Sequence, residues 1–174
     1  MKTVTKSCMI MVLLLTVWMS TPAGAEDLFE KEVQKEAEAV KLVRDVQRGE
    51  YGIVSTPELK AWMDSEKDMV MVDAMPSDSF QKKHIPGAVQ FLFPIPDMKD
   101  WDVKETGGKT KEDYAKLLGP DKDKTIVVYC GFVKCTRSHN AAVWAKSLGY
   151  KNVYRHPGGI YAWQGAKFQT EAVK

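Results

Sequence analysis

The stretch that decides the fold is "IVVYCGFVKCTRSHNAA", which runs from residue 126 to residue 142. It opens with an apolar run rich in β-branched side chains, and that run ends at Cys130. A polar loop with a second cysteine and an arginine follows, and the chain then takes on the composition of a helix. Binding sites of open parallel sheets lie at the carboxyl ends of strands. The pattern therefore places Cys130 where chemistry is expected.

The alternation of strand-like and helix-like segments extends outward in both directions. Apolar runs of strand length occupy residues 68–74, 84–91 (entered through a turn), 124–130 and 152–155, and helical patterns occupy 55–63, 76–83, 111–119, 138–149 and 158–166. Thr56 and Ser77 are predicted to cap the first two helices. Residues 94–109 hold two prolines and a glycine pair, so we expect a long surface loop that borders a site. Strands alternating with helices predict an α/β domain with a mostly parallel sheet.

Residues 1–25 have the features of a signal peptide. Lys2 and Lys6 precede an apolar run at residues 9–19, and small residues of the cleavage-site type end the segment. A transmembrane anchor is the alternative reading, although the apolar run is short for a bilayer span. We expect export to the periplasm or the extracellular space, with no membrane partner for the mature form.

Beyond the signal peptide we expect an amphipathic helix at residues 26–50 and a single domain at residues 51–174, because apolar residues recur at helical spacing in the first of these ranges. The full chain has 25 Lys and Arg against 23 Asp and Glu. Cleavage after residue 25 removes two lysines and no acid, which leaves a formal charge near zero. No basic field then calls for nucleic acid as a partner.

The residues around Cys130 suit a sulfur nucleophile. Because the loop leads into a helix, its backbone N–H groups are expected to converge on the thiol and on a bound anion. The positive helix end, together with Lys134 and Arg137, should lower the pKa of the Cys130 thiol and favour its thiolate. A buried strand-end cysteine with no chemistry is the alternative, and the polar loop argues against it.

Four segments of the chain resemble the rhodanese-like sulfurtransferase domain. They are "VSTPELKAWMDSEKDMVMVDA", "HIPGAVQF", "IVVYCGFVKCTRSHNAA" and "LGYKNVYRHPGGIYAWQGA", which together span about residues 53–168. The last two are the specific ones, because a strand ending in Tyr-Cys, a loop closing on Arg-Ser and a following "GG…AW" occur in that order.

This resemblance implies an open five-stranded parallel sheet flanked by helices, to which the N-terminal helix is an addition. It also implies that Cys130 takes sulfane sulfur from a small sulfur-containing anion such as thiosulfate, becomes a persulfide, and passes the sulfur to a thiol, a cyanide-type acceptor or a protein. Arg137 would help to bind the anionic donor, and the resemblance implies neither a cofactor nor a metal. The residues that would cradle the persulfide are Gly131, Phe132, Val133, Lys134, Cys135, Thr136 and Arg137.

The chain departs from the family pattern in three places. The common loop is C-x-x-G-x-R, whereas six residues separate Cys130 from Arg137 here. A larger loop makes a larger anion site, which keeps a phosphatase or arsenate-reductase activity as an alternative. The family often has Asp-x-Arg after its early strand, but Met75 stands where that arginine would be. Finally, Cys135 occupies a loop position at which the common pattern has glycine.

The role of Cys135 stays open at this point. It could resolve an oxidised or persulfidated Cys130 as a disulfide, which would also suit a non-enzymatic redox module. It could equally be a loop residue without chemistry, or join Cys130 and His139 as a ligand of a soft metal ion, although no fourth ligand is evident. We expect a structural role for His84, a packing or surface role for His139, and leave His156 undecided at the mouth of the site.

Overall fold

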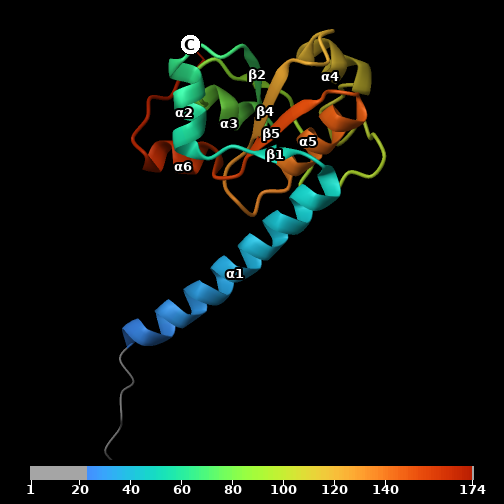
Figure 1. Cartoon of the computed structure of the whole chain (residues 1–174). Coiled ribbons are helices and arrows are strands. Elements are labelled where there is room, and N and C mark those ends of the chain that lie inside the picture. The colour runs from blue at the N-terminus through green and yellow to red at the C-terminus, as the bar shows by residue number, and fades with distance from the viewer. Residues whose placement is uncertain (1–22, 174) are drawn as a thin grey trace, which may run out of the picture. The chain divides into compact units, whose positions relative to one another are not determined.

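The computed structural model describes residues 23–173, and the predicted signal peptide therefore lies almost entirely outside the described residues. The first element is a long helix, α1 (Ala23–Gly49), close to the helix expected at residues 26–50 (Figure 1). The chain divides between Gln34 and Lys35 into two compact units, so the C-terminal turns of α1 belong to the same unit as the sheet. Within the described part, no helix is both long and apolar enough to cross a bilayer.

A five-stranded, all-parallel sheet forms the centre of the larger unit (Figure 1). Its spatial order is β1-β5-β4-β2-β3, which places β4 at the centre between β5 and β2. This confirms the expected α/β fold, although the strand pattern of the sequence missed β1 because it has only two residues. The strands are β1 (Gly52–Ile53), β2 (Met69–Asp73), β3 (Val89–Gln90), β4 (Thr125–Tyr129) and β5 (Asn152–His156).

Helices cover both faces of the sheet, because alternate residues of each strand point to opposite sides. Ile126 and Val128 of β4 pack into one core with the helices α4 (Lys111–Leu118) and α5 (Arg137–Ser147). Val127 and Tyr129 pack into the second core with three further helices. β4 is thus buried on both faces, as a central parallel strand must be. The helices of the second core are α2 (Thr56–Asp64), α3 (Ser77–Lys82) and α6 (Gly159–Gly165).

Both predicted helix caps are wrong by one residue. Ser55, not Thr56, caps α2: its hydroxyl accepts the Glu58 N–H, and the Glu58 carboxylate accepts the Ser55 N–H at 2.9 Å. This reciprocal pair needs an acidic or amide side chain three residues after the cap, and a cap at Thr56 would find Leu59 there. In α3 the cap position is Pro76, which makes no side-chain hydrogen bond to the helix.

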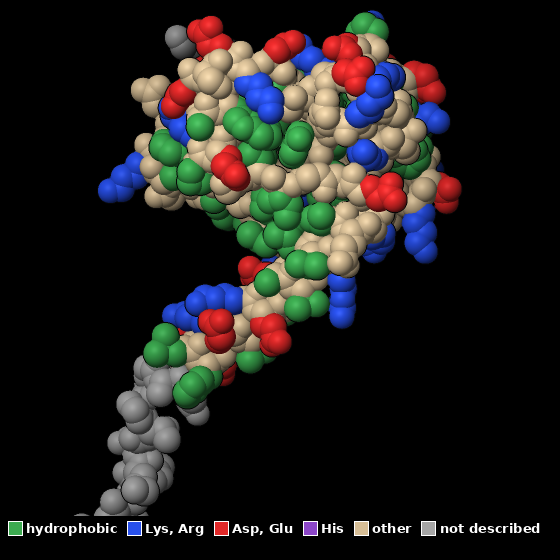
Figure 2. All heavy atoms as spheres, viewed as in Figure 1, with side chains coloured by type: hydrophobic (Ala, Val, Ile, Leu, Met, Phe, Trp, Pro, Cys, Tyr) green, Lys and Arg blue, Asp and Glu red, His purple; other side chains and the backbone are tan. Residues whose placement is uncertain are grey.

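The segment between β3 and α4 contains neither a helix nor a strand, as predicted for residues 94–109. Asn140 of α5 attaches this loop to the domain. Its Nδ2 donates to the carbonyl oxygens of Pro94 and Pro96 at 2.9 and 2.8 Å, and its Oδ1 accepts the Met98 N–H at 3.1 Å. On the face of the protein in Figure 2, side chains of both charge signs are interspersed, as a near-neutral chain predicts.

Candidate active site

Cys130 lies directly after the central strand β4, at the carboxyl end of the sheet. Its side chain is fully buried. Sγ lies 3.1 Å from the hydroxyl oxygen of Ser138 in the first turn of α5, and 3.4 Å from the carbonyl oxygen of Cys135. The strand, the loop and the start of the helix therefore meet at the thiol, in the arrangement that the sequence predicts.

The pKa of the Cys130 thiol is raised, which is opposite to the sequence prediction, and the pKa of the neighbouring Cys135 is lowered instead. Burial, and then the hydrogen bond and charge of Cys135, raise the pKa of the Cys130 thiol, although the hydroxyl and N–H of Ser138 oppose this. The hydrogen bond from Cys130 lowers the pKa of Cys135 to about 6, and the backbone N–H groups of Arg137 and Gly131 add to this effect against partial burial. The surroundings of the pair therefore favour a thiolate at Cys135 over one at Cys130.

The loop N–H groups that were predicted to stabilise a sulfur on Cys130 therefore act on Cys135 more than on Cys130. The Ser138 N–H helps to lower the pKa of Cys130, whereas the Arg137 and Gly131 N–H groups of the loop lower that of Cys135. The N–H of Cys135 itself donates to the Phe132 carbonyl at 3.0 Å. Both thiols are free. In this conformation Cys135 takes the place among the amides that the sequence assigned to the persulfide.

The other predicted loop residues lie in three different environments. Phe132 and Lys134 are exposed; Phe132 stacks on Tyr161, with ring centroids 5.5 Å apart, and Lys134 pairs with Glu38 of α1 at 3.1 Å. Arg137 donates to the carbonyl oxygen of Phe93, so its guanidinium is attached to the segment after β3. The loop brings the predicted residues together around the cysteines, with Gly131 and Thr136 buried and Val133 partly buried.

Sequence reasoning missed Arg155 of β5, which binds two backbone carbonyls of this loop. Its side chain is fully buried. Nη2 donates to the carbonyl oxygens of Val133 and Cys135 at 2.9 and 2.8 Å, and Nε donates to the Ser138 hydroxyl at 2.9 Å. Nη1 pairs with Asp45 of α1 at 3.3 Å. The available signal was a charged residue inside a segment predicted as a strand.

Gly159 was also missed as a site residue, because "GG" served only as a family marker. Its φ is +56°, and the first N–H groups after it bind the cysteine loop: Ile160 donates to the Cys130 carbonyl at 2.9 Å and Tyr161 to the Gly131 carbonyl at 3.0 Å. A Cβ at position 159 would lie 2.1 Å from the Cys130 carbonyl oxygen. The start of α6 can therefore approach the loop this closely only with glycine.

His139, one of the three histidines, faces away from the cysteines. Its Nε2 lies 3.0 Å from Arg48 Nη2 and its Nδ1 lies 2.9 Å from the Tyr51 hydroxyl. Since arginine only donates, Nε2 accepts and Nδ1 carries the proton of a neutral ring. Burial lowers the pKa of His139 to about 4. The three suggested metal ligands are thus not brought together, and no other group of three His, Cys, Asp or Glu suits a metal among residues 23–173.

His84 and His156 have structural surroundings. The backbone of His84 exchanges two hydrogen bonds of 2.9 Å with Glu171, and its ring stacks on Phe80 with centroids 3.9 Å apart, which fits the predicted structural role. His156 is buried, and its Nδ1 lies 3.2 Å from the Val54 carbonyl oxygen. Burial lowers the pKa of His156. It therefore does not form an exposed edge of the site.

Asp73, the last residue of β2, lies beside the site. Its Oδ1 accepts the Met75 N–H at 2.8 Å, and burial raises the pKa of Asp73 to about 6. Met75, which stands where the family often has arginine, lies close to the loop: a Cβ on Gly131 would be 3.8 Å from its sulfur. A cavity of about 240 Å³ lies elsewhere, between the loop around Asp97 and the helix α5, and the cysteine loop does not line it.

The fold and the site define an α/β domain with a buried cysteine at the carboxyl end of its central strand, in the loop that leads into α5. A model of the rhodanese-like domain matches residues 55–166, and the chain therefore belongs to the rhodanese-like domain family. The match begins after α1, so the contacts of α1 with the cysteine loop lie outside the family pattern.

Individual relatives resemble parts of the chain. It is 47% identical over 45 residues to the tRNA uridine(34) hydroxylase of Erwinia tasmaniensis, a match that covers 25% of this chain and 12% of that protein. It is 25% identical over 138 residues to the chloroplastic rhodanese-like domain-containing protein 14 of Arabidopsis thaliana, covering 64% and 62%. The chain thus spans less than two thirds of the length of these curated relatives.

Solved structures support the same fold. A thiosulfate sulfurtransferase from Pseudomonas aeruginosa superposes with a TM-score of 0.57 at 22% identity, covering 79% of this chain and 23% of that one. A Rhodopseudomonas palustris protein described as a possible tyrosine phosphatase superposes with a TM-score of 0.51 at 23% identity, covering 75% and 93%. At these identities the likeness establishes the architecture alone.

Proposed function

We propose that this protein is a sulfurtransferase that moves sulfane sulfur from a thiosulfate-type donor to a thiophilic acceptor through a Cys130 persulfide. One observation carries the proposal: Cys130 stands at the carboxyl end of the central strand of a rhodanese-like domain, hydrogen-bonded to Ser138 at the start of α5. A helix start of this kind suits an anionic donor and an anionic persulfide.

The proposed chemistry uses both cysteines. The Cys130 thiol gives its proton to the Cys135 thiolate once Cys135 has left the Gly131 and Arg137 amides, which lower its basicity. The Cys130 thiolate then attacks the outer sulfur of thiosulfate, the S–S bond of the donor breaks, and sulfite leaves with the bonding electron pair. In the second half, cyanide or a thiolate attacks the outer sulfur of the persulfide and releases the Cys130 thiolate. No net oxidation or reduction of the enzyme occurs over the cycle.

Access to the thiol requires movement of the loop, because Cys130 is fully buried in this conformation. Phe132 and Lys134 are the exposed loop residues, so the segment around them is the part that can move toward solvent. Cys135 must also leave its place between the Gly131 and Arg137 amides before the persulfide sulfur can occupy it. Donor binding and displacement of Cys135 are therefore expected to be coupled.

Intact mass spectrometry tests the proposal. After incubation with thiosulfate and removal of excess donor, the wild-type chain should gain one sulfur atom, and cyanide should remove it as thiocyanate. Cys130→Ser should gain none, whereas Cys135→Ser should still gain it at a reduced rate because its base is missing. Loading of Cys130→Ser at the wild-type level would reject the proposal. Turnover of an aryl phosphate without sulfur loading would favour the oxyanion-hydrolase alternative.

The contact between the two thiols supports a second, redox role. The Cys135 thiolate can attack the inner sulfur of the Cys130 persulfide, forming a Cys130–Cys135 disulfide and expelling hydrosulfide. A dithiol reductant would then have to restore both thiols. Loss of two hydrogens from the mass after sulfur loading, together with released hydrosulfide, would establish this route. A stable persulfide without hydrosulfide release would exclude it.

We further propose that the protein is exported, from the signal-peptide pattern of residues 1–25. Expression in a bacterial host with separate recovery of periplasmic and cytoplasmic fractions tests this. The exported form should begin near residue 26, and a full-length chain retained in the membrane fraction would favour the anchor reading.

A further inference from the structure

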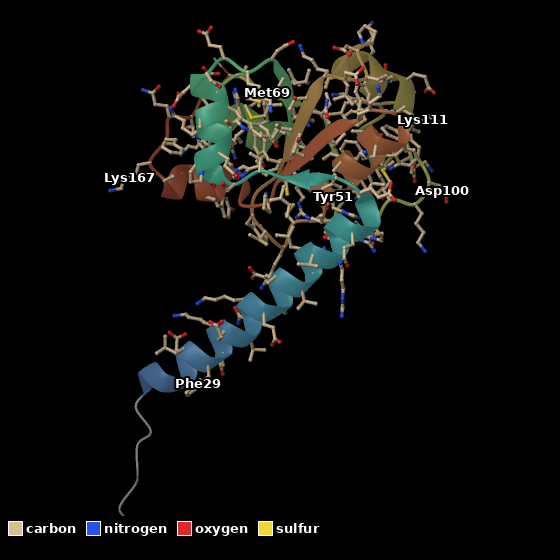
Figure 3. The ribbon with its side chains drawn as sticks, viewed as in Figure 1. Phe29, Tyr51, Met69, Asp100, Lys111 and Lys167 are labelled. Carbon is tan, nitrogen blue, oxygen red and sulfur yellow. The ribbon has the colours of Figure 1, made fainter. Side chains whose placement is uncertain are left out.

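Two side chains of α1, one paired with the cysteine loop and one paired with Arg155, lie on one face of the helix. Glu38 and Asp45 are seven residues apart, which is two helical turns and therefore the same side. Glu38 pairs with Lys134 of the loop, and Asp45 pairs with the buried Arg155. Figure 3 shows α1 leading directly into Tyr51, whose hydroxyl binds His139 of α5. These last turns of α1 belong to the same compact unit as the sheet.

Arg155 connects Asp45 to the reacting sulfur. Its guanidinium binds the Val133 and Cys135 carbonyls on one edge and the Ser138 hydroxyl on another, and that hydroxyl lies 3.1 Å from Cys130 Sγ. Because the C=O and the following N–H of a peptide point in opposite directions, fixing these two carbonyls also fixes the N–H groups of the next residues. The orientation of these two loop peptides therefore depends on Arg155.

Asp45 in turn fixes Arg155. Its carboxylate is almost completely buried and accepts from Arg155, from Lys41 at 2.5 Å and from Arg48 at 3.0 Å. Burial alone would raise the pKa of Asp45, but the hydrogen bond from Lys41 and the positive charges of Lys41 and Arg155 lower it. The carboxylate is thus ionised, and it is the one carboxylate paired with Arg155 among the described ion pairs.

We propose that Asp45 and Arg155 are positioning residues of the active site, acting as a pair through which α1 sets the conformation of the loop between Cys130 and Arg137. The expected effect on sulfur loading rests on the proposed function, whereas the effect on the conformation of the loop does not. Neither residue touches the sulfur, and both act through the loop carbonyls and Ser138. The sequence, which predicted only an amphipathic helix here, did not indicate this role for α1.

The test uses Asp45→Asn, which keeps the shape of the side chain and removes its charge. Asp97→Asn is the matched control, because Asp97 also pairs with an arginine of α1, Arg48 at 3.0 Å, but does not contact the loop. The readout is the rate at which iodoacetamide modifies the loop cysteines as a function of pH, with the modified residue located by peptide mass. Thermal unfolding of each variant establishes that it is folded at the assay temperature.

We expect the pH midpoint for alkylation of the loop cysteines to rise by about one unit in Asp45→Asn. At pH values below the midpoint, this rise corresponds to about a tenfold loss of their thiolate form. Asp97→Asn should leave the midpoint unchanged. Arg155→Lys should show the same rise, since an ammonium group cannot bind two carbonyls, a hydroxyl and a carboxylate in one plane. If Arg155→Lys does not fold, Asp45→Asn alone decides.

A folded Asp45→Asn protein with the wild-type midpoint would overturn the proposal. An equal shift in Asp97→Asn would also overturn it, because attachment of α1 in general would then be the cause. Sulfur loading from thiosulfate, measured on the same samples at a pH below the wild-type alkylation midpoint, should fall about tenfold in Asp45→Asn because the thiolate fraction falls by that factor there. If the wild-type chain takes no sulfur, the proposed function fails, while the alkylation profiles still decide the role of the pair.

Discussion

Replacing Gly159 by alanine should destabilise the domain and displace the backbone of the reacting cysteine. Gly159 begins α6 at a φ of +56°, where a side chain is disfavoured. The added Cβ would lie 2.1 Å from the Cys130 carbonyl oxygen and 2.8 Å from the Gly131 carbonyl carbon. Both are backbone atoms, and both peptides also accept N–H groups of α6. No side-chain rotation can relieve the contact, so the loop or the helix has to move.

The cost has two parts. A left-handed conformation costs an L-residue roughly 1–2 kcal/mol. Forcing an extra carbon into a closely packed site costs about 1–3 kcal/mol. The sum, about 2–5 kcal/mol, is a large fraction of the free energy of unfolding of a typical domain, about 5–15 kcal/mol. At roughly 3–5 °C per kcal/mol for a domain of this size, the Tm should fall by about 6–25 °C.

Two other glycines of the chain distinguish the cost of the left-handed conformation from the cost of the steric clash. Gly165 lies at the other end of α6 with an ordinary φ and no atom within 4 Å of its Cβ position. Gly87 has a φ of +77° and also has open space there. Circular dichroism melts and urea unfolding of the three Gly→Ala variants should rank Gly165→Ala as least affected, then Gly87→Ala, then Gly159→Ala. Equal losses for Gly87→Ala and Gly159→Ala would refute the backbone clash at Cys130.

Three further predictions concern the loop and its surroundings. Cys130→Ala removes the hydrogen bond that contributes most to the low pKa of Cys135, so the alkylation midpoint of Cys135 should rise from about 6 toward 9. Ser138→Ala removes a hydrogen bond that favours the Cys130 thiolate, and sulfur loading measured by intact mass should slow about tenfold, as expected for one hydrogen bond to a charged group. Burial lowers the pKa of His139 from 6.5 to about 4, so below pH 6.5 this histidine binds a proton more readily in the unfolded chain than in the folded one. The urea midpoint should therefore fall as the pH drops from 6.5 toward 4. His139→Gln should flatten this fall, and an unchanged slope would show that another group is responsible.

Local sequence patterns were sufficient for the centre of the fold. β4 is an uninterrupted apolar run because both of its faces are buried, and a run of that kind is visible in any sequence. The position of Cys130 at its end, and of the helix that follows, are matters of adjacent residues. The opposite pKa shifts of Cys130 and Cys135 could not be predicted, because they depend on which sulfur is buried and which N–H groups face each one.

The contacts that organise the loop are not local. Asp45 and Arg155 are 110 residues apart, and each has an ordinary appearance in its own segment. Asp45 lies on a helix rich in charged residues, most of whose acidic side chains are exposed. The sequence therefore does not show that Asp45 is the buried one. Arg155 was the stronger signal, since a guanidinium in the middle of a sheet must find partners for its donors. Which partners it finds depends on the strand order, which places β5 next to β4.

Two of the three departures from the family pattern, the enlarged loop and the missing arginine after β2, have a common physical account in Arg155. The loop directs the Val133 and Cys135 carbonyls inward, and buried carbonyls require donors. Met75, in the position of the missing arginine, lies next to the loop but supplies no donor. β2 and β5 flank β4 on opposite sides, so a guanidinium at the carboxyl end of either strand is placed to reach the loop. In this chain it comes from β5, and because it is buried it requires the carboxylate that α1 provides through Asp45. The added helix, the buried arginine and the larger loop therefore form one dependent set, in which loss of any member leaves polar groups of the others without partners.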